Sequence, residues 1–270
     1  MYFETSDRQV FATTGGKSFD NKKPVVIFLS GSGLDHTFWG LYARHFAFRN
    51  YSVLALDLPG HTHSEGPALC SIEAMADWLN EVANVLEIDN ISIVAHSMGC
   101  LIALEFVARN ADKIRSVSLI TSGLATAVNP ALIEAAQSQP GKAIAMMLGW
   151  GFGSTGHLHQ GAIPGNSMIS SGCKVMSGNA PNALATDLKA CNAYQNGKTA
   201  AESITTTPVQ VILAGKDRMA PPEATAELVS HLHEPEQHII AESGHMLPLE
   251  NPDECRNLLK KFIFSHNPAT

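Results

Sequence analysis

The strongest constraint on the fold is a regular alternation of short apolar runs with helix-like segments. Six short runs of β-branched and apolar residues are candidate strands, and most of them are continuously apolar: Val25–Ser30, Ser52–Asp57, Ile91–His96, Ser116–Thr121, Val209–Ala214 and Gln237–Ala241. Continuous apolarity is typical of strands that are covered on both faces. Helical patterns lie between the runs, at Phe38–Arg49, Ser71–Glu87, Met98–Asn110, Pro221–His233 and Pro252–Phe264. The alternation predicts an α/β fold, with a mostly parallel sheet and helices on both of its faces.

The alternation is interrupted once, between about residues 124 and 204. This segment contains a stretch rich in Gly, Ser, Asn and Met that has no strand pattern. Helical patterns flank it at Pro130–Leu148 and Asn182–Asn196, and the strand pattern resumes at Val209. We therefore predict a core domain in two parts, residues 1–123 and 205–270, with a mostly helical cap inserted between two strands at residues 124–204.

Composition narrows the classes of protein to which this chain can belong. The 270 residues carry a formal net charge of −7 and no run of Lys or Arg, which argues against a nucleic-acid-binding protein. No apolar run approaches the ~20 residues of a membrane helix, and the N-terminus lacks the pattern of a secretory signal. The five cysteines are odd in number and include no Cys-x-x-Cys, so we expect reduced thiols. We expect a cytoplasmic protein with no nucleic-acid or membrane partner, whose oligomeric state the sequence does not indicate.

Polar residues follow directly after several predicted strands, where the active sites of open parallel sheets lie. Ser97 follows the third strand, Asp217 follows the fifth and His245 follows the last. A serine hydroxyl needs a base such as imidazole to become nucleophilic, and the base needs a carboxylate to fix its tautomer. We therefore predict that Ser97, His245 and Asp217 meet at one edge of the sheet as nucleophile, base and orienting acid.

Acyl transfer also needs two N–H donors aimed at the charged oxygen of the tetrahedral intermediate. One is the backbone N–H of Met98, because this residue begins the helix that follows Ser97. The other is expected in the glycine-rich loop after the first strand, where Ser32 is best placed.

These residues lie in five short segments: LSGSGLDHTFW, DLPGHTHS, AHSMGC, LAGKDRMAPP and SGHMLPLENP. In that order, the segments resemble the oxyanion loop, the Asp-x-x-Gly-x-x-x-Ser loop, the Gly-x-Ser-x-Gly nucleophile turn, the acid turn and the histidine turn of the α/β-hydrolase fold superfamily. Each motif alone is a weak signal, whereas all five in order are a strong one. The resemblance implies the serine-nucleophile form of this fold, with a cap domain and no cofactor, for nearly the whole chain.

Three positions depart from the usual pattern of the family. Ala95 stands where the nucleophile turn has its first glycine, and it adds one methyl group at a close approach of strand and helix. Ser30 stands where the oxyanion loop commonly has histidine, and Thr62 stands where glycine is common. The departures leave the predicted Ser97, Asp217 and His245 set intact. We expect the changes at Ser30 and Thr62 to alter the mouth of the pocket and the hydrogen bonds beneath the loop.

The cap is expected to supply part of an apolar substrate pocket, because methionine side chains adapt to irregular shapes. The predicted pocket residues are Gly31, Met146, Trp150, Phe152 and Met246. Met147, Met168 and Met176 of the same insertion could also line the pocket. Ordinary packing of the cap on the core is the alternative role for its Met, Trp and Phe side chains. Three His-x-His pairs, at residues 61/63, 157/159 and 231/233, have no matching carboxylate or cysteine cluster, so no metal site is expected.

The sequence therefore predicts a serine hydrolase that cleaves a small to medium carboxylic ester, or a related acyl compound, through an acyl-enzyme. Hydrolysis of carbon–carbon bonds, lactones or amides, and perhydrolase chemistry, stay open within the same resemblance. The rival from another class is a non-catalytic ligand-binding or signalling protein, because a fold alone does not specify function. A receptor in which Ser97 turns over slowly is a third interpretation.

Overall fold

Eight strands form one sheet in the described parts of the chain, which are residues 1–154 and 167–269 of this computed structural model. Their order across the sheet is β1-β2-β4-β3-β5-β6-β7-β8. The strands are Tyr2–Glu4 (β1), Gln9–Thr13 (β2), Val25–Leu29 (β3), Ser52–Leu56 (β4), Ile91–His96 (β5), Ile114–Ile120 (β6), Val209–Ala214 (β7) and Glu236–Ile240 (β8). Strands β3 to β8 run parallel, whereas β1 and β2 pair antiparallel at one edge.

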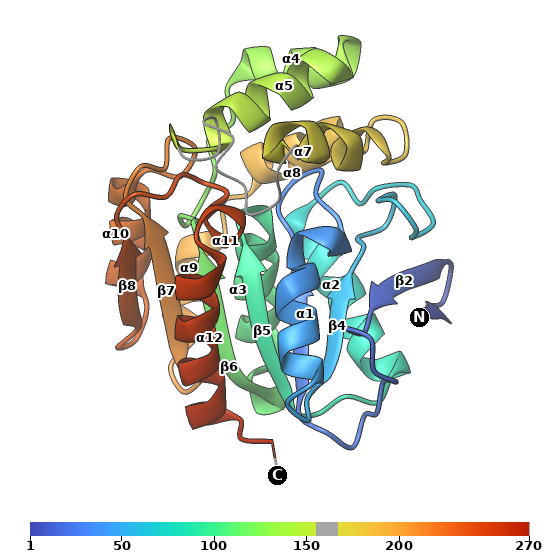
Figure 1. Cartoon of the computed structure of the whole chain (residues 1–270), viewed down its shortest axis with the longest axis vertical. Coiled ribbons are helices and arrows are strands. Elements are labelled where there is room, and N and C mark those ends of the chain that lie inside the picture. The colour runs from blue at the N-terminus through green and yellow to red at the C-terminus, as the bar shows by residue number, and fades with distance from the viewer. Residues whose placement is uncertain (155–166, 270) are drawn as a thin grey trace.

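Helices cover both faces of the sheet (Figure 1). One face carries α2 (Ile72–Val85), α3 (Met98–Arg109), α9 (Gly197–Ser203) and α10 (Pro222–His231), and the other carries α1 (Gly40–Ala47) and α12 (Pro252–His266). Short helices lie at His36–Trp39 (η1), Ala111–Lys113 (η2) and Leu247–Glu250 (α11). Ile93 and Val94 of β5 are both fully buried, but they belong to separate cores, because successive strand side chains point to opposite faces. The strands are apolar at successive positions because each face of the sheet packs into its own hydrophobic core.

Within the described ranges, four helices that follow β6 and precede β7 in the chain lie above one end of the sheet (Figure 1). They are α4 (Pro130–Ser138), α5 (Pro140–Gly151), α7 (Met168–Ser177) and α8 (Ala183–Ala193), and we call them the cap. The predicted fold class, a mostly parallel sheet covered on both faces with an inserted helical cap, is confirmed. The exact division of the chain at residues 124 and 204 stays a prediction, and His157 and His159 lie outside the described residues. No helix of the described residues has the length and hydropathy required to span a bilayer.

Three local features differ from the sequence-based expectation. The helix expected over Pro130–Leu148 is divided at Gln139, which has φ −144° and ψ +65°. The reason is Pro140, because a proline disfavours the α conformation in the residue before it. Helix α7 was not expected because its sequence, MISSGCKVMS, is rich in Ser and Gly. The antiparallel pair of β1 and β2 was not expected either, since both strands are only partly buried.

Candidate active site

The turn from β5 into α3 carries Ser97 at its apex. Ser97 has φ +54° and ψ −121°, a strained conformation that the flanking strand and helix hold in place. Its N–H donates to the carbonyl of Ile120, at the end of the neighbouring strand β6, at 3.1 Å. Gly99 is required by a close approach, because a Cβ at this position would lie 2.6 Å from the carbonyl oxygen of Leu29. The turn thus keeps its sharp geometry although position 95 is alanine.

Ser97, His245 and Asp217 form one hydrogen-bonded series. Nε2 of His245 lies 2.9 Å from Oγ of Ser97, and Nδ1 of His245 lies 2.8 Å from Oδ2 of Asp217. The other oxygen of Asp217, Oδ1, accepts the backbone N–H groups of Met219 and Ala220 at 2.8 and 2.9 Å. These bonds fix the orientation of a carboxylate whose side chain is fully buried. The three residues predicted from three separate strand ends are therefore brought together.

The loop that carries His245 is held by its backbone. The carbonyl of His245 accepts hydrogen bonds from Nε2 of His96 at 2.8 Å and from Oγ1 of Thr121 at 3.2 Å. The N–H of the preceding residue, Gly244, donates to the carboxylate of Glu250 at 3.1 Å. The position of the imidazole beside Ser97 therefore depends on three contacts that its own ring does not make.

His96 lies directly before Ser97 but outside the hydrogen-bonded series. Its side chain is 1% exposed, and its ring centroid lies 5.0 Å from that of His245. Because Nε2 donates to a carbonyl, Nδ1 is the unprotonated nitrogen in the neutral ring, and it has no partner among the described residues. Burial, followed by the neighbouring His245, lowers the pKa of His96 to about 3. His96 is therefore a neutral support for the loop of His245.

The two backbone N–H groups predicted as oxyanion donors belong to Ser32 and Met98. Neither forms a hydrogen bond with the described residues. Met98 is the first residue of α3, and the first N–H groups of a helix have no partner within it. The two side chains also touch, because Oγ of Ser32 lies 3.4 Å from Sδ of Met98. Both N–H groups are therefore available beside Ser97.

Ser30 and Thr62, the two residues that depart from the family pattern around the oxyanion loop, both donate a hydrogen bond to Asp35 of that loop. Oγ of Ser30 donates to the carbonyl of Asp35 at 3.1 Å, which ties the start of the loop to its end. Oγ1 of Thr62 donates to Oδ2 of Asp35 at 3.0 Å. The hydroxyl of Ser30 thus supports the loop at the position where the family commonly has histidine.

A cavity of 440 Å³ leads to Ser97 and His245. Of the predicted pocket residues, Gly31, Trp150 and Met246 line this cavity. The two others do not line it: Met146 and Phe152 pack within the apolar core between cap and sheet.

The cap contributes further apolar lining residues, of which the sequence analysis named only Met147. They include Leu132 of α4, Met147 of α5, and Leu188 and Cys191 of α8. Successive residues of a helix point about 100° apart, so Met147 and Met146 face different directions. The buried residues Ile144, Met147 and Leu148 have the i, i+3, i+4 spacing of a core-facing stripe. That spacing is the signal that distinguishes Met147, which lines the cavity, from Met146, which does not.

The model of the alpha/beta hydrolase family matches residues 26–258. The chain belongs to this family. Protein ABHD8 from Bos taurus is 25% identical over 247 residues, which cover 88% of this chain and 56% of ABHD8. The chain spans between 24% and 56% of the length of the curated relatives that it matches.

Solved structures show the same fold at low sequence identity. The enol-lactonase from Burkholderia xenovorans LB400 has a TM-score of 0.86 and 20% identity, over 97% of this chain and 99% of that chain. An esterase from Exiguobacterium antarcticum has a TM-score of 0.84 and 16% identity, over 97% of this chain and 98% of that chain. These similarities extend over the sheet and the cap alike.

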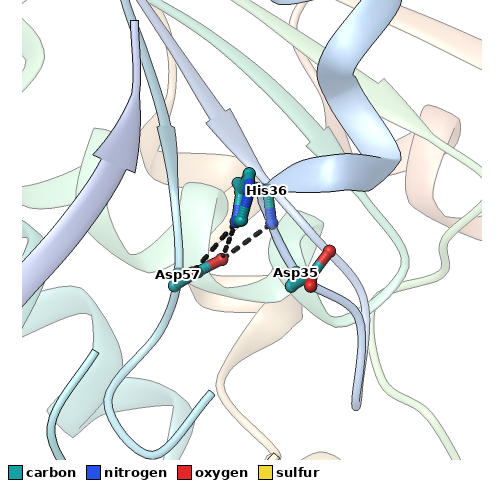
Figure 2. Close-up of side chains that lie close together, drawn as sticks. All are labelled: Asp35, His36 and Asp57. Atoms are coloured by element: carbon teal, nitrogen blue, oxygen red, sulfur yellow. Dashed lines mark hydrogen bonds and ion pairs between the residues drawn. The ribbon is translucent and has the colours of Figure 1, made fainter. Parts of the chain in front are cut away.

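Three polar residues, Asp35, His36 and Asp57, lie close together where the oxyanion loop ends (Figure 2). His36 donates its backbone N–H to Oδ1 of Asp57 at 2.8 Å, and its Nδ1 lies 2.9 Å from the same oxygen. Burial lowers the pKa of His36, but the hydrogen bond and the charge of Asp57 outweigh it, and the pKa is raised. Figure 2 also shows Asp35 beside this pair.

The ligand atoms of these three residues, Asp35, His36 and Asp57, lie close enough together to hold a metal ion. Among the described residues, no other group of His, Cys, Asp or Glu side chains has this spacing. Their carboxylate oxygens, however, already accept hydrogen bonds from the chain. Those of Asp57 accept from His36 and the N–H of His63, and those of Asp35 accept from Thr37 and Thr62. These hydrogen bonds hold the end of the oxyanion loop in place, so we interpret the three residues as a structural support for the loop.

Proposed function

We propose that this member of the alpha/beta hydrolase family is a serine hydrolase that cleaves carboxylic esters through an acyl-enzyme. The observation that carries the proposal is the series from Ser97 Oγ through the His245 imidazole to the Asp217 carboxylate, with distances of 2.9 and 2.8 Å. A serine within hydrogen-bond reach of a base, which a third group orients, has the geometry of an activated nucleophile.

The reaction follows from these contacts. Oγ of Ser97 attacks the ester carbonyl while Nε2 of His245 accepts its proton, and Asp217 stabilises the resulting imidazolium through Nδ1–H. The N–H groups of Ser32 and Met98 bind the oxyanion of the tetrahedral intermediate. His245 then protonates the leaving alcohol. A water molecule, activated by the same imidazole, attacks the acyl-enzyme, and the acid is released.

The cavity suggests the class of substrate. Its lining is largely apolar in the cap, where Leu132, Met147 and Leu188 contribute, and its volume is 440 Å³. Space of this size and polarity suits an uncharged acyl group of small to medium length. The enol-lactonase and the esterase that share the fold are consistent with carboxylic ester or lactone substrates.

Labelling with a fluorophosphonate tests the nucleophile. The reagent should modify Ser97, whereas a label on Ser32 or Ser122, the other serines of the cavity lining, contradicts the assignment. Ser97→Ala should lower ester turnover by about 10⁴- to 10⁶-fold. Ser230→Ala is the matched control, because Ser230 is exposed on α10, and it should react and turn over like the unmodified protein.

A substrate panel then separates the alternatives. Para-nitrophenyl esters of increasing acyl length, lactones, amides and diketones are compared at equal concentration, and kcat/KM should be highest for short to medium esters. A preference for lactones, amides or diketones would replace the ester assignment by one of the other hydrolytic reactions. Turnover of none of them, together with no fluorophosphonate label, would favour a non-catalytic binding protein.

A further inference from the structure

The cap contacts the oxyanion loop through both backbone polar atoms of one residue, Gly33. The N–H of Gly33 donates to Oδ2 of Asp187, in cap helix α8, at 2.8 Å. The carbonyl of Gly33 accepts from Nδ2 of Asn179, which precedes α8, at 2.8 Å. A Cβ on Gly33 would lie 2.7 Å from Cε of Met176 and 3.0 Å from Cδ1 of Leu184, both in the cap. The loop and the cap are therefore in direct contact at this glycine.

Asp187 is also paired with a buried histidine of the core. Nε2 of His61 lies 2.9 Å from Oδ2 of Asp187, and the side chains are 1% and 0% exposed. Nδ1 of His61 lies 3.2 Å from the carbonyl oxygen of Pro59. Both ring nitrogens thus face acceptors, and only the imidazolium donates from both. Burial lowers the pKa of His61, but the charge and the hydrogen bond of Asp187 outweigh it and raise the pKa.

This buried pair is not explained by stability alone. Removing two charges from water costs free energy that their attraction often does not recover, and apolar residues of similar volume frequently stabilise a protein as well or better. Oδ1 of Asp187 also has no hydrogen-bond partner among the described residues. The contact that an apolar residue could not replace is the hydrogen bond from the N–H of Gly33.

Gly33 directly follows Ser32, whose N–H is one of the two oxyanion donors in the proposed function. The cap reaches Ser32 as well, because Sγ of Cys191 in α8 lies 3.7 Å from Oγ of Ser32. A displacement of about 1 Å in a catalytic group is enough to lower a rate by orders of magnitude. The contacts of α8 therefore act on a part of the site where small movements matter.

We propose that Asp187, held by His61 and aided by Asn179, is a positioning residue through which the cap sets the place of the Ser32 N–H in the oxyanion hole. The inference rests on the proposed serine-hydrolase function. Asp187 touches no substrate, and it acts through the peptide of Gly33. The cap then has two roles, since it lines the acyl pocket and also completes the catalytic site.

The test compares Asp187→Ala and Asp187→Asn with the unmodified chain on the best ester of the panel. Asp187→Ala should lower kcat by about tenfold to hundredfold, less than the 10²- to 10³-fold loss on deleting an oxyanion donor outright, with KM changed by less than threefold. Asp187→Asn should recover part of that loss, because its amide oxygen still accepts the N–H of Gly33. Affinity for a trifluoromethyl ketone, whose adduct with Ser97 carries the oxyanion, should fall in parallel with kcat.

Ile144→Ala is the control for a general weakening of the cap. Ile144 is buried in α5 and is not among the residues that line the cavity, so this variant should unfold more easily but keep its kcat. If Asp187→Ala does not fold, Asn179→Ala provides the measurement, because Asn179 is only half-buried and its loss also frees Gly33. A kcat within twofold of the unmodified protein in a folded Asp187→Ala or Asn179→Ala variant overturns the inference.

Hydrogen exchange separates this inference from the proposed function. Backbone amides of residues 30–36 should exchange faster in Asp187→Ala, and at the unmodified rate in Ile144→Ala. If the unmodified protein cleaves no ester, the proposed function fails, and exchange alone then shows whether Asp187 holds the loop. Unchanged exchange in Asp187→Ala would mean that it does not.

Discussion

Acid should destabilise this protein through His96, and the size of the effect follows from its burial. The folded-state pKa of His96 is about 3, against an ordinary value of 6.5. As the pH falls below 6.5, the unfolded chain takes up a proton that the folded chain excludes, so the free energy of unfolding decreases. At pH 4.5 the two pKa values imply a loss of roughly 2–3 kcal/mol, whereas at pH 7 the loss is well under about 1 kcal/mol.

Urea unfolding at pH 7 and pH 4.5 measures this effect when the protein is compared with His96→Gln. The variant has no titrating group at this position, so over the same pH interval its free energy of unfolding should fall less than that of the unmodified protein, by roughly 2–3 kcal/mol. With a urea dependence of about 2–3 kcal/mol per molar, the acid shift of the midpoint should differ between the two proteins by about 1 M. Other carboxylates and histidines titrate in both proteins, and their contributions cancel in the comparison.

His233→Gln is the matched control, because the same substitution is made there at an exposed histidine. Its pH dependence should equal that of the unmodified protein. Parallel stability curves for His96→Gln and the unmodified protein would refute the reasoning. They would mean that His96 is protonated in the folded state, or that water reaches its ring.

Two further variants test the acid, Asp217, and the turn that carries Ser97. Asp217→Asn should lower kcat by about 10⁴-fold at neutral pH with little change in unfolding, because an amide favours the wrong tautomer of His245; retention of more than a tenth of the activity would contradict the role of the acid. Gly99→Ala should lower the free energy of unfolding by about 1–3 kcal/mol in urea titrations, since its methyl group would overlap the carbonyl of Leu29. Gly141→Ala is the comparison, because its methyl group meets no atom within 4 Å, and equal stabilities of the two variants would show that the turn relaxes freely.

Sequence patterns predicted the sheet because the physics behind them is local. Apolar runs such as Ile91–His96 coincide with their strands, and the helix expected from Met98 begins at that residue. Parallel strands end at a common edge, so Ser97, Asp217 and His245 could be placed together from sequence order alone. The weakest expectations concerned the cap, where neighbouring residues such as Met146 and Met147 differ in direction.

The sequence by itself determined the fold class, the turn that carries Ser97 and the meeting of three side chains at the edge of the sheet. Each of these depends on residue type at short spacing or on the order of the strands. Only the tertiary structure decided how the oxyanion loop is supported, through the contacts of Asp187 with His61 and of Asn179 with Gly33, which are separated by 126 and 146 residues. A hydrogen bond requires two atoms within about 3 Å, and no local pattern specifies that meeting. In the sequence, nothing distinguishes Asp187 from any other acidic residue of a helix. Only its burial against the core brings it to its partner, His61.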